Sequence, residues 1–81
     1  MRPSQSQPFT REEHLELARE LRQARIKLRE LASLVVEVYG PQNHASLAFW
    51  KITEALDALS EIMQAQAAED LRGQSVDGIY T

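Results

Sequence analysis

Apolar side chains recur with a seven-residue period over two long segments, which a Gly-Pro pair separates. With His14 taken as position a of the heptad, positions a and d of the first segment are His14, Leu17, Leu21, Ala24, Leu28, Leu31, Val35 and Val38. Seven of these eight are apolar, and the segment contains neither Gly nor Pro. The pattern predicts an amphipathic helix over residues 10–39, about 45 Å long at 1.5 Å per residue.

The boundaries of both helices carry recognisable signals. Thr10 and Glu13 form the spacing of a capping box at the start of the first helix. Gly40-Pro41 predicts its end, and Asn43 is a suitable cap for a second helix over residues 44–72, which Gly73 closes. The predicted interface positions of this second helix are Ala45, Phe49, Ile52, Leu56, Leu59, Met63, Gln66 and Asp70.

A connection as short as residues 40–43 makes the two helices antiparallel neighbours. The sequence therefore predicts an all-α fold, a two-helix hairpin in which residues whose numbers add up to about 83 lie opposite each other. Residues 1–9 have the composition of a flexible arm, with prolines, serines and glutamines. Residues 73–81, the tail, lack a helical period and are expected to be extended.

Two helices facing each other bury only one apolar stripe each, and this chain has more apolar residues than two stripes hold. Leu15, Ile26, Leu34, Val36, Leu47, Trp50 and Ile62 fall outside the stripes. A chain of 81 residues without cysteine has no disulfide to offset a small core, so we expect self-association into a four-helix bundle, as a homodimer. The residues expected to serve that association are Leu17, Leu21, Leu28, Leu31, Val35, Phe49, Ile52, Leu56, Leu59 and Met63.

Aromatic residues gather near the turn, and they are enriched at binding hot spots. Trp50 attracts particular interest because its heptad position points away from the partner helix. The tail alternates polar and apolar residues around Gly78, a pattern that can add a strand or dock in a groove, of a partner or of its own bundle. The residues predicted to contact a protein partner are Tyr39, Leu47, Trp50, Val76, Ile79 and Tyr80; ordinary packing within the bundle is the alternative.

Composition narrows the function classes. The net charge of −3 disfavours broad binding to nucleic acids or anionic membranes, and no apolar run is long enough to span a bilayer. The absence of cysteine fits a reducing compartment, and a cytoplasmic location is expected. No catalytic residue set, metal site or cofactor is expected. The sequence favours a small non-enzymatic interaction module that acts as an adaptor, inhibitor or regulatory subunit.

Two alternatives remain. Glu12-Glu13-x-x-Glu16 followed by Glu54-x-x-Asp57 resembles the motif pattern of MazG-like nucleotide pyrophosphohydrolases, all-α enzymes, and the resemblance implies Mg²⁺ held by carboxylates of neighbouring helices. In an antiparallel hairpin these two sets lie roughly 20 Å apart, so only a parallel arrangement or an intersubunit contact would unite them. The simpler reading is solvated carboxylates in the first turns of helices.

The second alternative rests on basic residues. Arg19, Arg22, Arg25 and Arg29 follow one another on the first helix and would suit a nucleic-acid-associated regulator. Acidic residues stand at the same height on the second helix, so ion pairs between helices are the competing interpretation. His14 at the open end, where Glu69 and Asp70 should approach it, lacks a second histidine nearby and is expected to be a polar bundle end.

Overall fold

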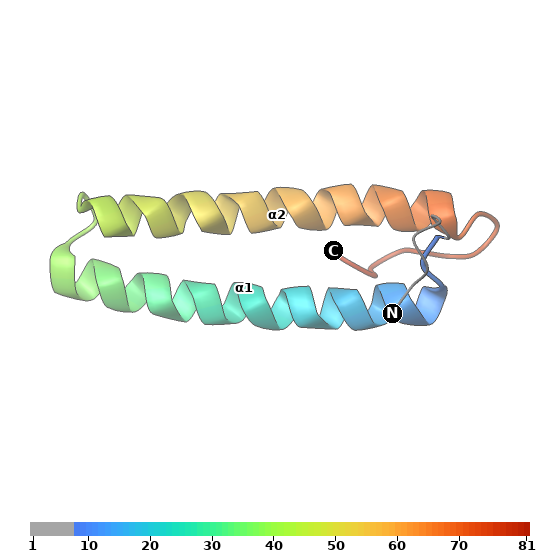
Figure 1. Ribbon diagram of the computed structural model, residues 1–81, viewed down its shortest axis with the longest axis horizontal. Coiled ribbons are helices and arrows are strands. Elements are labelled where there is room, and N and C mark those ends of the chain that lie inside the picture. Colours follow the sequence, from blue (N-terminus) through green and yellow to red (C-terminus); the bar gives the residue numbers. More distant parts are fainter. Residues whose placement is uncertain (1–7) are drawn as a thin grey trace.

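The computed structural model describes residues 8–81 and shows two antiparallel helices joined by a short turn (Figure 1). Helix α1 covers Arg11–Tyr39 and helix α2 covers His44–Asp70, and residues 8–81 contain no strand. The predicted all-α hairpin is confirmed, with both helices within two residues of their expected bounds. The expected flexible arm lies outside the described residues, apart from its last two positions. Because the fold is only 15 Å thick along its shortest axis, it is a single layer.

The local signals in the sequence act as expected. The Thr10 hydroxyl accepts a hydrogen bond from the Glu13 backbone N–H, and the Glu13 carboxylate accepts one from the Thr10 backbone N–H, which completes the capping box. At the other end of α1, Gly40 adopts a φ of 87°, which lets the chain leave the helix. Asn43 caps α2 by accepting a hydrogen bond from the Ala45 N–H.

Side-chain pairs across the hairpin fix its register. His14 lies 2.9 Å from Asp70 at the open end, where α1 begins and α2 ends. Arg25 lies 2.9 Å from Asp57 near the middle of the hairpin. Both pairs fit the predicted antiparallel register.

The predicted packing positions are correct at a, but at d every residue except Leu17 is exposed. On both helices the a positions, such as Leu28 and Leu56, lie between the helices, but Leu31 and Ile52 at position d are exposed. The residues that pack instead occupy position e and are mostly small: Ala18, Arg25, Ala32, Ser46, Thr53, Ser60 and Ala67. Small side chains let the two helices approach closely, which turns the larger residues at d to the outside.

The buried apolar core sits at the open end and includes the tail. Its members are Ala18, Ala67, Leu71, Ile79 and Tyr80. The expectation of an extended tail is wrong, because turns at Gly73 and Gly78, both with positive φ, fold it back (Figure 1). The tail therefore adds apolar cover to one half of the hairpin only, and in the turn half the buried residue is Ser46.

Candidate functional site

The hairpin has two different faces, which follow from the heptad positions. Residues at b and e of both helices line one side; they include Val36 and Trp50 in one cavity and Arg22 and Asp57 in another. Since d lies on the other side of a from e, the d residues of both helices share the opposite side. We call these the groove face and the apolar face.

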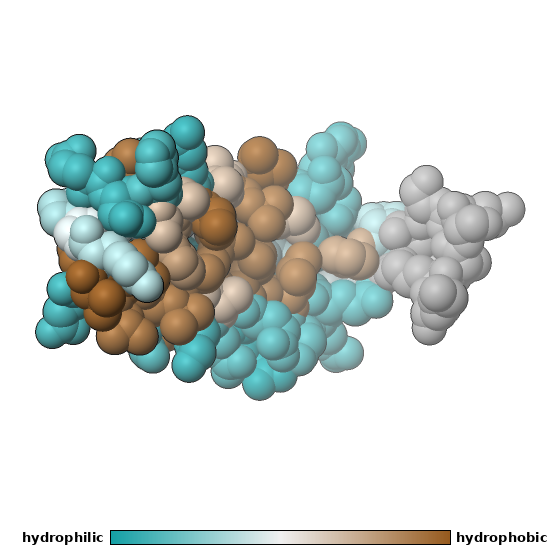
Figure 2. All heavy atoms as spheres, turned by 60° about the vertical axis from the view of Figure 1, so that its left-hand side comes forward, coloured by the Kyte–Doolittle hydropathy of each residue, from teal (hydrophilic) through white to brown (hydrophobic). Residues whose placement is uncertain are grey.

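The apolar face carries six large side chains that are more than a third exposed. They are Leu31, Leu34, Val38, Ile52, Leu59 and Ile62, at positions d and g. Figure 2 shows one side of the molecule, on which a broad apolar band runs along the hairpin between hydrophilic margins. Soluble monomers rarely expose a contiguous patch of this kind, so the apolar face is a candidate binding surface.

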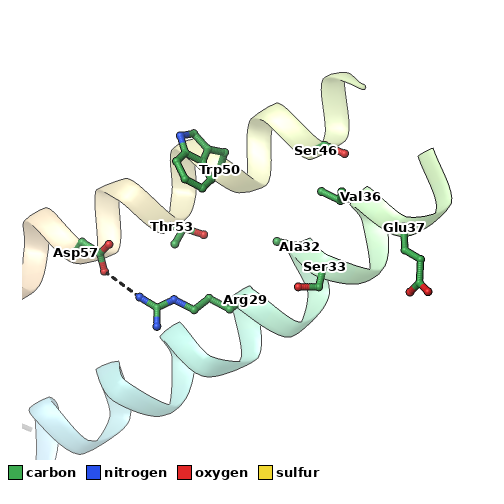
Figure 3. A pocket seen from close by; sticks show the side chains of 9 residues that line it. All are labelled: Arg29, Ala32, Ser33, Val36, Glu37, Ser46, Trp50, Thr53 and Asp57. Carbon is green, nitrogen blue, oxygen red and sulfur yellow. Dashed lines mark ion pairs between the residues drawn. The ribbon is translucent and has the colours of Figure 1, made fainter. Parts of the chain in front are cut away.

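On the groove face, a cavity of about 710 Å³ opens between the helices near the turn. Its lining comes from both helices: Arg29, Ala32, Ser33, Val36, Glu37, Ser46, Trp50, Thr53 and Asp57 (Figure 3). A second cavity, of about 550 Å³, shares Arg29 and Asp57 with it and reaches the tail at Tyr80 and Thr81. The two cavities therefore adjoin along one groove: the tail lies in its open half, and no tail residue lines its turn half.

Hydrogen bonds between side chains of the hairpin and the backbone of the tail hold the tail in the groove, together with apolar contacts. Arg22 donates a hydrogen bond to the Ile79 carbonyl, at 3.3 Å, and the Gln64 amide donates one to the Val76 carbonyl, at 2.7 Å. The Gln64 side chain also accepts a hydrogen bond from the Tyr80 N–H. Arg11 donates a hydrogen bond to the Ser75 carbonyl. Helix α1 and helix α2 thus both bind the tail.

A buried polar cluster lies beneath the tail at the open end. His14 is fully buried, with Nε2 2.9 Å from an Asp70 oxygen and Nδ1 2.8 Å from the Tyr80 hydroxyl. Phe9 packs edge-on against the imidazole at 5.4 Å between ring centroids. The predicted approach of Asp70 to His14 is confirmed, and the polar interpretation of this bundle end fits the geometry.

Two pKa values in this cluster are displaced. Burial acts to raise the pKa of Asp70, but hydrogen bonds from Gln66 and His14, the charge interaction with His14 and the Phe9 backbone N–H together lower it below 3.8. Burial, together with the negative charge of Asp70, raises the pKa of Tyr80 above 10.0. Each shift favours the form that bonds in the fold, an ionised Asp70 and a neutral Tyr80.

The arginine residues contact partners within the chain. Arg25 and Arg29 both approach Asp57, at 2.9 and 3.9 Å, so the predicted ion pairs between helices are confirmed for these two. Arg19 pairs with Glu16 on its own helix. Their side chains are partly exposed, and such pairs stabilise by about 0–1 kcal/mol each. The stronger effect of the two pairs between helices is to favour the antiparallel register.

The structure does not bring the two acidic motifs together within one chain. Glu13 and Glu16 lie at the open end, where Glu13 caps α1, while Asp57 faces Arg25 near the middle of the hairpin. From Glu13 to the level of Arg25 the rise along α1 is about 18 Å. Among residues 8–81, no three His, Cys, Asp or Glu side chains gather as a metal site would require.

No family model, curated protein or solved structure matches the chain. The site must therefore be interpreted from its own residues. Neither helix has an apolar stretch long enough to cross a membrane, a statement that covers residues 8–81.

The predicted interaction residues fall into two groups. Tyr39, Leu47 and Trp50 are exposed and available to another molecule. Ile79 and Tyr80 are buried against their own hairpin, and Val76 packs beside them, so these three contact the same chain. Sequence reasoning did not find the hydrogen bond between Tyr80 and His14; a histidine at an apolar heptad position was the available signal.

Of the residues predicted to serve self-association, seven lie partly buried along the hairpin: Leu17, Leu21, Leu28, Val35, Phe49, Leu56 and Met63. Leu31, Ile52 and Leu59 lie on the apolar face. The first group packs between the two helices of the hairpin, whereas the second group is exposed.

Proposed function

We propose that this protein is an interaction module that self-associates through its apolar face into a four-helix bundle and binds another protein as an adaptor, inhibitor or regulatory subunit. One observation carries the proposal: four of the five large apolar residues at position d, Leu31, Val38, Ile52 and Leu59, are exposed on one face. Fully burying a side chain of this size contributes about 1.5–3 kcal/mol relative to exposure. A surface with several of them gains most from a matching surface.

A second copy of the chain supplies such a surface. In a four-helix bundle each helix has two neighbours, so it needs apolar positions beyond a single stripe. Here positions a and e serve the hairpin and position d is left for the second neighbour. Leu31 and Ile52 lie at the same height on the two helices, with Ala24 and Ala45 among the small residues of the same row. A twofold axis through this row would set large residues against the same surface of the other copy.

The test compares Ile52→Glu with Ile26→Glu in the full chain. The two isoleucines have similar exposure, 46% and 54%, but Ile26 lies at position f, away from the apolar face. Light scattering should give a dimer for the wild type and for Ile26→Glu, and a smaller species for Ile52→Glu, because the substitution buries an unpaired carboxylate at the interface.

Circular dichroism of the same samples reports whether Ile52→Glu still forms helices. If the hairpin folds only as a dimer, Ile52→Glu should lose both its helices and its dimeric state. Persistence of the wild type as a folded 9.2 kDa monomer at high concentration would contradict self-association. Equal behaviour of the two variants would contradict the assignment of the face.

A further inference from the structure

We propose that the turn half of the groove binds an aliphatic–aromatic pair of side chains on a segment of a partner protein. The inference rests on the proposed role as an interaction module and adds the place and the chemistry of the contact. In the open half of the same groove the chain binds a pair of this kind itself, Ile79 and Tyr80.

In the open half, the floor of the groove is formed by two alanines. Ala18 of α1 and Ala67 of α2 are 4% and 0% exposed because Ile79 and Tyr80 of the tail pack against them. Leu21 and Met63 flank the same cluster. Small residues on the floor thus create a space that one aliphatic and one aromatic side chain fill.

The turn half repeats this floor two heptads further along. Fourteen residues from Ala18 and Ala67, in the direction of the turn, stand Ala32 and Thr53, which line the 710 Å³ cavity. The flanking apolar pair recurs as Val35 and Phe49, again partly buried between the helices. Ala32 repeats Ala18, whereas Thr53 is larger than Ala67 and its hydroxyl donates a hydrogen bond to the Phe49 carbonyl. No tail residue lines this cavity.

The rim of the groove differs between the halves, and the difference indicates how the occupant is held. In the open half the rim residues Arg22 and Gln64 bond to the tail backbone. Their counterparts two heptads along are Val36 and Trp50, which are 38% and 64% exposed. An occupant of the turn half is consequently held by side-chain contacts rather than by bonds to its backbone, and Trp50 offers the largest apolar area.

Among residues 8–81 the chain offers no free segment as an occupant. Ile79 and Tyr80 are already buried in the open half, so the tail cannot fill both halves at once. The face proposed for self-association lies on the opposite side of the a positions, so a dimer formed there leaves the turn half of the groove accessible. We therefore expect the occupant to be a segment of a different protein.

The probe is a synthetic peptide with the sequence of residues 76–81, which carries the Ile-Tyr pair, added to the full-length protein. Trp50 is the only tryptophan of the chain, so its fluorescence reports directly on the turn half. We expect a saturable change in its emission. A control peptide in which Ser replaces both Ile and Tyr should bind roughly tenfold more weakly or worse, because burying these side chains drives binding.

The matched protein variants are Ala32→Leu, which fills the floor, and Ala58→Leu, which adds the same side chain at an exposed position away from the groove. Ala32→Leu should abolish the fluorescence response while Ala58→Leu retains it, with both variants helical and of unchanged oligomeric state. Failure of the wild type to respond at millimolar peptide, or an unchanged response in Ala32→Leu, would overturn the inference. Dissociation of the oligomer by Ala32→Leu would also overturn it, because the groove would then be an interface between copies. Dissociation by Ile52→Glu alone leaves it standing.

Discussion

The hydroxyl oxygen of Tyr80 lies 2.8 Å from Nδ1 of His14, a residue 66 positions earlier in the chain. The other imidazole nitrogen lies 2.9 Å from an Asp70 oxygen. Since an ionised carboxylate only accepts hydrogen bonds, Nε2 carries the proton and donates it to Asp70. The Tyr80 hydroxyl is the partner of the other ring nitrogen, Nδ1, because a hydroxyl both donates to a bare nitrogen and accepts from a protonated one. This chain of hydrogen bonds ties the tail to α1 and α2 at once.

Replacing Tyr80 with Phe removes the hydroxyl but keeps the ring. The buried Nδ1 of His14 then lacks its partner, so we expect the free energy of unfolding to fall by about 1–2 kcal/mol. Chemical denaturation at a fixed protein concentration measures this loss. Tyr39→Phe is the control, because Tyr39 is 65% exposed, and it should leave the free energy unchanged. Equal effects of the two substitutions would show that the hydrogen bond does not stabilise the fold.

Alkaline conditions provide an independent check on Tyr80. Its pKa in the fold is raised, so the neutral phenol stabilises the native state fully below pH 10, and this contribution is lost as the pH rises through the folded-state pKa. The stability difference between wild type and Tyr80→Phe should therefore shrink above pH 10. In Tyr39→Phe the remaining tyrosine is Tyr80, and absorbance titration of that variant should show ionisation above pH 10. Ionisation of Tyr80 at the ordinary value of 10.0 would contradict the buried position.

Acid conditions test Asp70. Its folded-state pKa lies below the ordinary 3.8, so the ionised carboxylate contributes stability above that pH, and the contribution is lost as the pH falls through the lower folded value. We expect wild-type stability to decline below pH 4 more steeply than that of Asp70→Asn, whose amide oxygen can still accept from His14. Asp77→Asn, at an exposed position, should decline like the wild type. Thermal unfolding across pH 2–6 makes the comparison.

Ile79 tests whether the tail is part of the folded unit. Its side chain is 3% exposed in the core with Ala18 and Ala67, so Ile79→Ala should lower the free energy of unfolding by about 2 kcal/mol or more. Leu47→Ala, at an exposed position near the turn and away from the tail, should change it little. Hydrogen exchange should show amides of the tail losing protection in Ile79→Ala. A tail that exchanges freely in the wild type would contradict its place in the core.

Local chemistry explains how much of the fold could be predicted. Some signals act through neighbours in the sequence, so their effects can be predicted without the tertiary structure. They are Thr10 with Glu13, Gly40 before Pro41, and Asn43. The short turn then leaves antiparallel pairing as the arrangement the chain can adopt, which brings His14 to Asp70. The register follows from the length of the turn.

The sequence did not predict in the same way whether the residues at position d or those at position e pack between the helices. Both Leu31 and Ala32 are suitable for an interface by composition, and a heptad pattern favours the larger one. In the hairpin the small residues at e let the helices approach closely, and Leu31 turns outward. The same choice created the apolar face and the groove, so the candidate sites depended on it.

The sequence by itself determined two helices, their ends and their antiparallel register, because these depend on contacts between near neighbours and on the length of one turn. Only the tertiary structure decided that the tail folds back to join Tyr80 to His14 and that Trp50 borders an open groove. Those outcomes depend on which of several apolar surfaces pack together, and that is settled by the shapes of side chains far apart in the chain.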